Sequence, residues 1–401
     1  MLLFEGLKVL DVGTWVAGPV AGTILADFGA DVIKVEQPGQ GDPFRYLYRT
    51  QNAPGAEVNY TWIMDGRNKR SITLDLKSAE GQEALRKLIP DCDVYLTNQP
   101  MGVRRRMKLT YEDIAPLNER MVYASLTAYG ERGPEAEKTG FDGMAYWIRS
   151  GLSDMVRSPG GGPSQSIAGM GDHPTCVAMF ACVMMGLYKR QITGKGGSVS
   201  TSLLANGFWS ASCLGQAAIA GADFSARRNN TTIPERTWIR HPYVTSDDRQ
   251  MVLSMVRTPA QQEAFLKTIG LGDLLGDERF ADHESRMLNS AALRDRVAAV
   301  MATRTSDDWL RFFLERGINV SRLAHLEDMR TDEQAIANGV LATPREDIGV
   351  PYVINAPVFV DGVTRVGPKR APEVGEHTDE VLSELGYDTE TIATWREAGK
   401  I

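Results

Sequence analysis

The N-terminal part of the chain alternates short apolar runs with a segment of helix length. The run Leu7–Val12 is followed by Ala17-Gly18-Pro19, where a helix can begin, and Gly29 ends that helix before a second apolar run at Val32–Val35. Unbroken apolar runs of this length are typical of strands that are buried on both faces of a parallel sheet. The strand, helix, strand order therefore predicts a doubly wound α/β fold, with a ligand site at the carboxyl ends of its strands.

The same alternation continues along the chain. Further strands are predicted at residues 71–74, 93–97, 121–126 and 198–203. Helices are predicted from an N-cap at Ser78 to Leu88, and at residues 111–117, 258–269, 291–301 and 309–315. The longest apolar run, Cys176–Leu187, has 12 residues, which is too short to cross a bilayer. We interpret it as part of a buried helix that begins near Pro174 and ends before Gly194.

Length, charge and cysteine usage exclude several classes of function. A chain of 401 residues can bury a large core and more than one domain. Its net charge of −7 argues against a nucleic-acid partner, because phosphate binding needs clustered Lys and Arg. The four cysteines form no C-x-x-C pair, no histidines have metal-ligand spacing, and no signal peptide is present. We therefore expect a reduced cytoplasmic protein with no metal and no membrane partner.

Asp172 is the main candidate for chemistry. It lies on a glycine-flanked turn, Gly169-Met170-Gly171, at the positive end of the helix near Pro174, and this position favours its carboxylate form. A carboxylate there can cap the helix, or it can attack an activated carbonyl carbon as a nucleophile. With a pKa near the ordinary value of about 3.9, it would be ionised at neutral pH without a base. The residues alone leave both roles open.

Three other features have more than one interpretation. The turn G-T-W-V-A-G departs from G-x-G-x-x-G, although Glu36 after it imitates the ribose-binding acid of NAD-dependent dehydrogenases. The run Arg104-Arg105-Arg106 is either a solvated helix face or a set of guanidinium groups that bind phosphates. Met144, Trp147 and Trp209 could line a pocket, but at helical spacing such residues more often form core.

Six motifs occur in order between Gly6 and the last helix. They are G-L-K-V-L-D-V, A-G-P, L-A-D-F-G-A-D-V-I-K-V-E, G-D-P-F-R, the G-D of Asp172 with L-Y-K-R-Q-I-T-G-K-G-G, and E-V-G-E-H-T-D-E-V-L-S-E-L-G-Y. Together they resemble the class III CoA-transferase family, which includes formyl-CoA and carnitine CoA-transferases and 2-methylacyl-CoA racemases. The resemblance implies a Rossmann-like large domain at 1–222, a smaller α+β domain at 241–325, and a return to the large domain at 326–401. The polar stretch at 223–240 is the predicted linker, and a homodimer of interlocked rings is also implied.

The resemblance further implies a coenzyme A site. In the family the Asp of the G-D motif is the catalytic nucleophile, which assigns that role to Asp172. The implied CoA contacts are Trp15, Val16, Ala17, Gly18, Gln37, Leu74, Asp75, Leu76, Lys77, Asn98 and Arg106. The implied substrate-pocket residues are Phe141, Asp142 and Gly171. Val16 replaces the Gln of formate-transferring members, so formate and oxalate are not expected as substrates.

Phe141 is the most informative departure from the family pattern. Racemase-like relatives have a His there and a Glu that aligns with His241, and they use both groups to exchange a proton beside the thioester. Phe141 cannot transfer a proton, and the carboxylate is also missing. We therefore expect transfer of CoA from an acyl-CoA thioester to a free carboxylic acid. A racemase or isomerase of the same fold, and a CoA-binding protein without catalysis, are the alternatives.

The expected reaction passes through Asp172. Its carboxylate attacks the thioester to give a mixed anhydride and CoA thiolate, and the thiolate returns to form an aspartyl-CoA thioester that an incoming carboxylate then attacks. Backbone amides at Gly169, Gly171 and the Ala17-Gly18 turn are candidate donors to the developing oxyanion. A second carboxylate at Asp142 is expected to raise the pKa of one of the pair.

Overall fold

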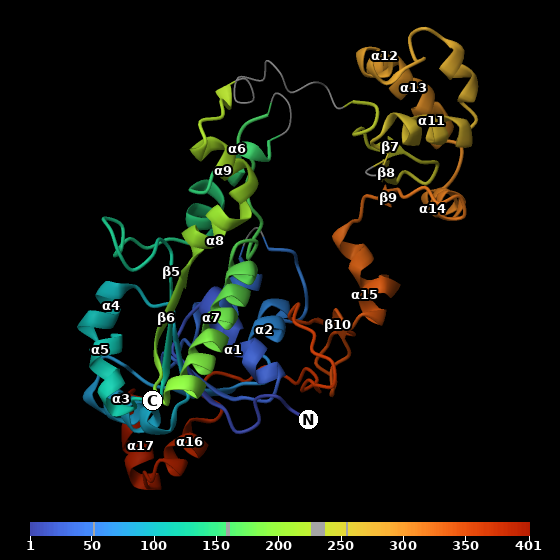
Figure 1. Cartoon of the computed structure of the whole chain (residues 1–401). Helices are drawn as coiled ribbons and strands as arrows, with labels where there is room; N and C mark the ends of the chain where they lie inside the picture. The colour runs from blue at the N-terminus through green and yellow to red at the C-terminus, as the bar shows by residue number, and fades with distance from the viewer. Residues whose placement is uncertain (51–52, 158–160, 226–236, 254–255) are drawn as a thin grey trace. The chain divides into compact units, whose positions relative to one another are not determined.

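The computed structural model describes residues 1–50, 53–157, 161–225, 237–253 and 256–401, which fall into two compact units. The larger unit comprises Met1–Arg157, Gly162–Ala222 and Glu333–Ile401, and the smaller comprises Ser158–Gly161 and Asp223–Asp332. The larger unit is thus built from both ends of the chain (Figure 1). The linker predicted at 223–240 falls mostly on residues 226–236, which lie outside the described residues.

A six-stranded parallel sheet forms the centre of the larger unit, as predicted. In the order β3-β2-β1-β4-β5-β6, every neighbouring pair of its strands is parallel. The strands are β1 (Lys8–Asp11), β2 (Asp31–Glu36), β3 (Arg70–Thr73), β4 (Val94–Thr97), β5 (Val122–Thr127) and β6 (Gly197–Ser202). The chain runs outward from β1 to one edge and from β4 to the other. The carboxyl ends of β1 and β4 therefore meet at a topological switch point.

Helices cover both faces of this sheet. On one face α1 (Ala17–Asp27) and α7 (Asp172–Thr193) pack against each other and against the strands (Figure 1). On the other face lie α3 (Ala79–Leu88), α16 (Thr378–Glu384) and α17 (Thr389–Glu397). Shorter helices in the described part of this unit are α2 (Tyr60–Asp65), α4 (Met101–Arg106), α5 (Tyr111–Ile114), α6 (Leu152–Met155), α8 (Leu203–Ser210), α9 (Ser212–Ile219) and α15 (Glu333–Ala337).

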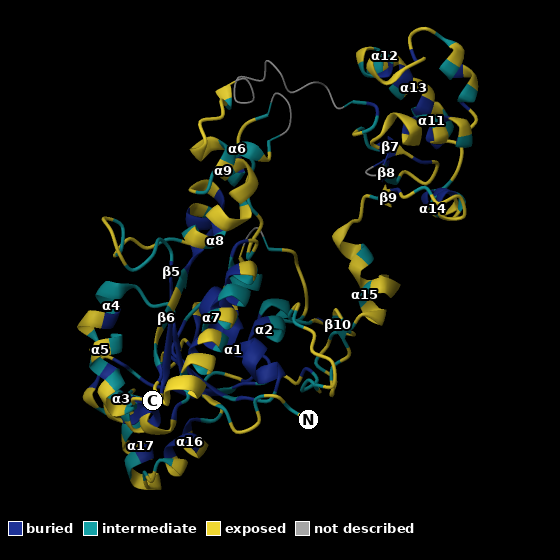
Figure 2. Cartoon of the chain, viewed as in Figure 1, coloured by how far each residue is buried: buried dark blue, intermediate teal, exposed yellow. Residues whose placement is uncertain are grey.

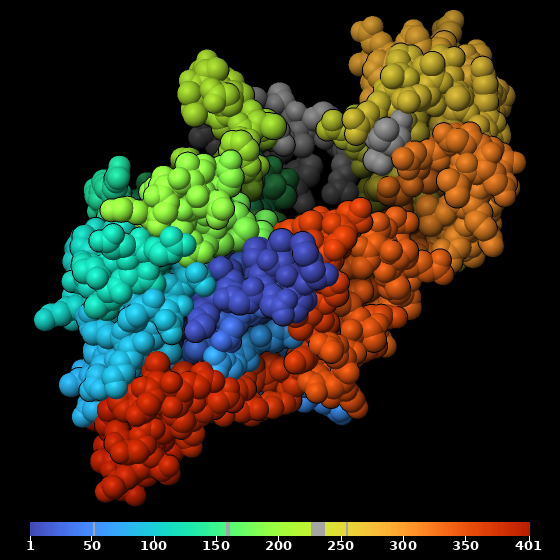
Figure 3. Space-filling model, turned by 60° about the horizontal axis from the view of Figure 1, so that its bottom comes forward, coloured from blue at the N-terminus to red at the C-terminus, as the bar shows by residue number. Residues whose placement is uncertain are grey.

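The C-terminal segment packs beside the N-terminal residues of the larger unit. The amide of Thr364 donates to the carbonyl of Met1 at 3.0 Å, and the amide of Val366 donates to the carbonyl of Asp27 at 2.7 Å. Figure 3 shows the blue N-terminal residues bordered by this orange and red segment. The same segment contains the short antiparallel pair β10 (Leu341–Ala342) and β11 (Val353–Ile354).

The smaller unit is an α+β structure with its own core. Its strands β7 (Tyr243–Val244), β8 (Gln250–Val252) and β9 (Ser321–Arg322) form an antiparallel sheet. Its helices are α11 (Pro259–Thr268), α12 (His283–Leu288), α13 (Ser290–Met301) and α14 (Ser306–Leu314). The core is aromatic: the ring of Phe313 stacks on those of Phe265 and Trp309, with centroids 5.5 and 5.1 Å apart.

The predicted strands and helices are confirmed, with small differences at their ends. The most important difference concerns α7, which begins at Asp172 rather than at Pro174 and ends at Thr193, with Gly194 as its C-cap residue. Gly194 has a φ of +74°, a conformation that favours glycine at the end of a helix. Asp172 is thus the first residue of α7. Among the described residues, no helix combines the length and apolar character that crossing a membrane requires.

Candidate active site

A cavity of about 490 Å³ opens at the carboxyl ends of the strands. Its lining comes from the segments at or after the ends of β1, β4, β5 and β6, from residues 136–144, and from the first residue of α7. This is the switch point at which doubly wound sheets bind ligands, and the volume suits a small molecule. The cavity brings together six residues assigned from the sequence, namely Trp15, Val16, Ala17, Asn98, Phe141 and Asp172.

Asp172 is half-buried where it lines this cavity. Gly171 is the N-cap residue of α7, and among the described residues no hydrogen bond to the Asp172 carboxylate is found, so the structure does not support a capping role. Burial, with a contribution from the charge of Asp142, raises the pKa of Asp172 to about 7. The sequence predicted an ordinary pKa. A helix N-terminus stabilises an anion by only about 0.3–1 kcal/mol, which is too little to offset this burial.

The carboxylate of Asp142 fixes the turn before Asp172. It accepts a hydrogen bond from the Gly171 amide at 2.9 Å and one from the Gly143 amide at 2.8 Å. Only glycine lets the backbone at position 171 pass this close to the Tyr146 side chain, because a Cβ atom at Gly171 would lie 2.6 Å from Cγ of Tyr146. The Gly171 amide is therefore occupied, and it is not free to stabilise an oxyanion as the sequence analysis suggested.

His173 follows Asp172 but its ring is engaged elsewhere. Nε2 lies 3.3 Å from Oδ1 of Asp65, and Nδ1 lies 3.1 Å from the carbonyl oxygen of Gly169. Burial lowers the pKa of His173, but the hydrogen bond to Asp65 and its charge, together with the Gly169 carbonyl and the charge of Asp172, outweigh it, so that the pKa rises to about 9. At neutral pH the ring therefore carries a proton and a positive charge. His173 therefore contributes a positive charge near Asp172, and it is not available as a base.

The segment after β1 is held in a strained conformation at the edge of the cavity. Trp15 has a φ of +64°, which is unfavourable for a bulky side chain and costs about 1–3 kcal/mol. Three hydrogen bonds hold it: the Trp15 amide donates to Asp42 at 2.9 Å, while Asn98 accepts from the Thr14 amide at 2.8 Å and donates to the Thr14 carbonyl at 2.6 Å. The Trp15 ring packs edge-on against Phe141, with centroids 5.2 Å apart. Asn98 is thus a positioning residue for this wall.

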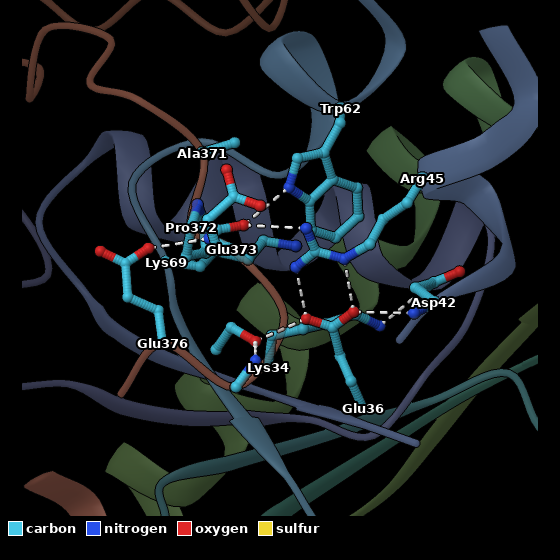
Figure 4. A network of polar contacts seen from close by, with 12 residues as sticks. Lys34, Glu36, Asp42, Arg45, Trp62, Lys69, Ala371, Pro372, Glu373 and Glu376 are labelled. Carbon is cyan, nitrogen blue, oxygen red and sulfur yellow. Dashed lines mark hydrogen bonds and ion pairs between the residues drawn. The ribbon is translucent and has the colours of Figure 1, made fainter. Parts of the chain in front are cut away.

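A buried network of charges lies beneath this segment (Figure 4). Nζ of Lys34 lies 2.9 Å from Asp42 and 3.8 Å from Asp11, and it donates to the carbonyl of Gly13. Lys69 pairs with Asp11 at 3.0 Å. Burial raises the pKa of Asp11, but the charges of the two lysines outweigh it and hold the pKa below its usual value. These ion pairs link β1 and β2 to the loop that carries Trp15.

Glu36 belongs to the same network and is fully engaged. Its two carboxylate oxygens accept from Nε and Nη2 of Arg45 at 2.8 and 2.7 Å, from the Asp42 amide at 2.7 Å and from Ser71 at 2.6 Å. Arg45 also lies over the ring of Trp62 at 3.9 Å (Figure 4). A ribose hydroxyl therefore has no access to Glu36, and the NAD interpretation is wrong for this residue.

The sequence matches known proteins over nearly its whole length. A family model described as CoA-transferase family III matches residues 4–378. The chain belongs to this family. It is 31% identical to the (R)-2-hydroxy-4-methylpentanoate CoA-transferase of Clostridioides difficile, over 99% of both chains. It is also 31% identical to the cinnamoyl-CoA:phenyllactate CoA-transferase of Clostridium sporogenes, over 97% of this chain and 95% of that one.

Solved structures agree with the assignment. A CAIB/BAIF family protein from Brucella suis is 26% identical, with a TM-score of 0.81 over 95% of this chain and 98% of its own. The sequence resemblance is thereby confirmed, and the chain is a CoA-transferase. CoA thioesters are the substrates of such enzymes.

Several residues assigned to CoA from the sequence do not line the cavity of this CoA-transferase. Gln37, Lys77 and Arg106 are exposed, whereas Leu74 and Leu76 are buried. Asp75 is half-buried and accepts from the Lys77 amide at 3.1 Å, and Gly18 lies behind Asn98. Within the described ranges, no group of three or more His, Cys, Asp and Glu side chains is arranged to hold a metal ion.

Other residues of the site were missed or left undecided by sequence analysis. Met144 lines the cavity, Trp147 is core, and Trp209 is exposed. Leu203 and Leu126 also line the cavity. Both lie at the carboxyl ends of predicted strands, where a doubly wound sheet binds ligands, so the sequence could have predicted them as lining residues. Lys34 and Asp42 lie within two of the quoted motifs, but the sequence did not predict their burial, because charged residues near strand ends are usually exposed.

The buried network predicts a large loss of stability when Lys34 is replaced. Lys34→Met leaves the buried Asp42 carboxylate without its cation, and we expect the free energy of unfolding to fall by about 3–5 kcal/mol in urea titrations. Lys8→Met is the matched control, since Lys8 pairs with Asp91 at 3.6 Å on the surface, and it should change stability by at most about 1 kcal/mol. Equal effects of the two substitutions would contradict a structural role for the network.

Proposed function

We propose that the protein moves CoA from an acyl-CoA thioester to a free carboxylic acid through a covalent intermediate on Asp172. The observation that carries this proposal is that Asp172 is the carboxylate that lines the cavity at the strand ends, at the N-terminus of α7. Among the lining residues, the other titratable side chain is Lys138, and no histidine is present. A nucleophile without a neighbouring acid and base pair suits acyl transfer better than racemisation.

The reaction begins and ends with one acyl-CoA thioester and one free carboxylate. The Asp172 carboxylate attacks the acyl carbonyl, which forms a mixed anhydride and expels CoA as its thiolate. The thiolate attacks the Asp172 carbonyl carbon, forms the aspartyl-CoA thioester and releases the donor acid as a carboxylate. The acceptor carboxylate then attacks that thioester, and the expelled thiolate attacks the acceptor carbonyl to give the new acyl-CoA and free Asp172. No oxidant, reductant or net proton is required.

Burial of Asp172 and the charge of Asp142 favour its conversion to an uncharged acyl derivative. The charge of Asp142 opposes ionisation of Asp172, and this repulsion disappears when Asp172 forms an anhydride or thioester. The first amides of α1, at Ala17 and Gly18, have no partner within the helix, and Ala17 lines the cavity. We propose these amides as oxyanion donors, because a helix N-terminus attracts negative charge.

CoA itself is proposed to lie along the loops at the strand ends. Of the three neighbouring arginines, Arg104 pairs with Glu131 and Arg105 with Glu137, whereas no ion pair or hydrogen bond of Arg106 is found among the described residues. Arg106 is therefore the guanidinium group available to the phosphates, which supports its assignment from the family pattern. Gln37, the backbone of Leu74–Lys77 and the Trp15–Gly18 segment complete the proposed CoA contacts.

We also propose that two copies of the chain form the interlocked dimer that the family pattern implies. Exposed residues are frequent on α7, α8 and α9 (Figure 2), and several of them are large and apolar. They include Met185, Tyr188, Ile192, Phe208, Trp209 and Ile219. Large apolar side chains that are exposed on helices in contact with one another, as α7 and α8 and also α8 and α9 are, support an interaction site. All four cysteines are free, which supports a reducing compartment such as the cytoplasm.

A covalent adduct provides the first test of the mechanism. Brief incubation with an acyl-CoA should add CoA, with loss of water, to the peptide that contains Asp172, and hydroxylamine should release it. Asp172→Asn should form no adduct and should lower CoA transfer by at least about a thousandfold. Asp142→Asn is the control that keeps the nucleophile and should still form the adduct. An adduct of equal amount in Asp172→Asn, measured by intact mass, would place the chemistry elsewhere.

The pH dependence of adduct formation provides a second test. Only the carboxylate form of Asp172 is nucleophilic, so the single-turnover rate should rise with pH and level off above about pH 7. Asp142→Asn removes a charge that raises the pKa of Asp172, so the rate should level off at a lower pH. A midpoint that stays unchanged or moves upward in this variant would show that Asp142 does not act on Asp172.

The dimer is tested by mass in solution. The wild-type protein should sediment as a dimer, and a double substitution Tyr188→Glu and Ile192→Glu should yield monomers, because two charges cannot be buried in an apolar interface without partners. Leu288→Glu, at an exposed leucine of the smaller unit, is the control and should leave the mass unchanged. A monomeric wild-type protein would overturn this part of the proposal.

A further inference from the structure

The wall of the cavity opposite the polar residues is apolar and partly aromatic. Trp15 and Phe141 pack edge to face, and Met144 and Leu203 extend the same lining. Phe141 and Met144 are 59% and 55% exposed, although both are large apolar side chains. Large apolar side chains that line a cavity and remain exposed to water gain free energy when an apolar ligand covers them.

The polar lining residues offer no free positive charge. Lys138 pairs with Glu135 at 2.6 Å and lies over the ring of Tyr129 at 4.6 Å. Asn98 is bound to the backbone of Thr14 through both its amide nitrogen and its oxygen. Thr127 accepts from the Gly130 amide at 2.9 Å. Among the described lining residues, Asp172 is thus the one charge without an ion-pair partner, and it is negative.

This distribution discriminates between acyl groups that differ in charge. An acyl group with a second carboxylate would place that charge against the apolar side chains of Trp15 and Phe141 and near Asp172. Burying a charge without a partner is strongly unfavourable, and the repulsion from Asp172 would add to this. A branched or aromatic hydrocarbon group of similar size would instead bury its apolar surface against the same wall, which is favourable.

We infer that the acyl groups exchanged are those of monocarboxylic acids with an apolar side chain, branched or aromatic, and that Phe141 and Met144 select them against dicarboxylic acids. The inference rests on the proposed covalent function of Asp172. We expect Phe141 to contribute more than Met144 to this selection, because the Phe141 ring packs edge to face against Trp15 and the two rings form one aromatic surface. Val16 contributes by presenting a hydrocarbon side chain to the same cavity.

The donor half-reaction tests the inference without requiring a known acceptor. Every acyl-CoA that reacts leaves the same aspartyl-CoA adduct on Asp172, so single-turnover adduct formation can be compared directly between donors. Isovaleryl-CoA and succinyl-CoA form one pair of similar size, and phenylpropanoyl-CoA and glutaryl-CoA form another. The apolar donor of each pair should react at least about 100-fold faster than its dicarboxylic partner at the same concentration.

Substitutions in the apolar cavity wall test which side chains discriminate between acyl groups. Phe141→Ala should slow adduct formation from phenylpropanoyl-CoA by about tenfold or more, and adduct formation from acetyl-CoA by less than about threefold. The acetyl group is too small to cover the wall, so it gains little from Phe141. Met144→Ala should act in the same direction with a smaller effect. Phe359→Ala is the matched control, because Phe359 is 56% exposed and lies outside the cavity lining, and it should change neither rate.

The possible outcomes separate the inference from the proposed function. Adduct formation that is as fast or faster with succinyl-CoA or glutaryl-CoA would overturn the inference and leave the covalent function standing. Equal slowing of acetyl-CoA and phenylpropanoyl-CoA by Phe141→Ala would remove Phe141 from the selection. If CoA binds but no donor gives an adduct, the proposed function fails first, and the inference fails with it.

Discussion

The hydrogen bond from the Gly171 amide to Asp142 is the contact on which the site depends. It fixes the turn that begins α7, and it places the Asp142 carboxylate next to Asp172. Burial of Asp172 and the nearby charge of Asp142 together raise the pKa of Asp172. The result is a nucleophile whose charged form is partly destabilised before any substrate binds. Acylation of Asp172 removes this destabilisation.

The other side of the cavity depends on buried ion pairs beneath an irregular loop. In dinucleotide-binding folds the first loop after β1 is rich in glycine, so that the backbone can approach a pyrophosphate. Here Trp15 occupies a left-handed conformation in that loop, and contacts from Asn98 and Asp42 hold it there. The same sheet topology thus presents an aromatic wall to the cavity. Lys34 and Arg45 neutralise the acids that support this arrangement.

The sequence predicted the fold well because the fold depends on local apolar patterns. Runs such as Leu7–Val12 and the glycine at 194 determine where strands and helices begin and end, and the structure confirms these elements. It also marked Asp172 as a candidate from its place at a helix start, and the structure places this residue at the first position of α7. The family resemblance predicted that Asp142 raises the pKa of one of the two carboxylates, but it did not say which one, and the burial of Asp172, which is the larger cause, could not be predicted from the sequence. Burial of Lys34 in the sequence D-V-I-K-V-E was equally hidden, since its partners come from β1 and from the loop after β2.

The fate of the acceptor's carboxylate oxygens tests the covalent role of Asp172 most directly. If CoA passes through an aspartyl thioester, each acceptor molecule leaves one of its oxygens on the Asp172 side chain. An acceptor whose carboxylate carries the heavy stable isotope of oxygen should therefore label the peptide that contains Asp172 after a single turnover, as measured by peptide mass spectrometry. Complete turnover with an unlabelled Asp172 would mean that CoA passes directly between the two acids, and it would contradict the covalent route.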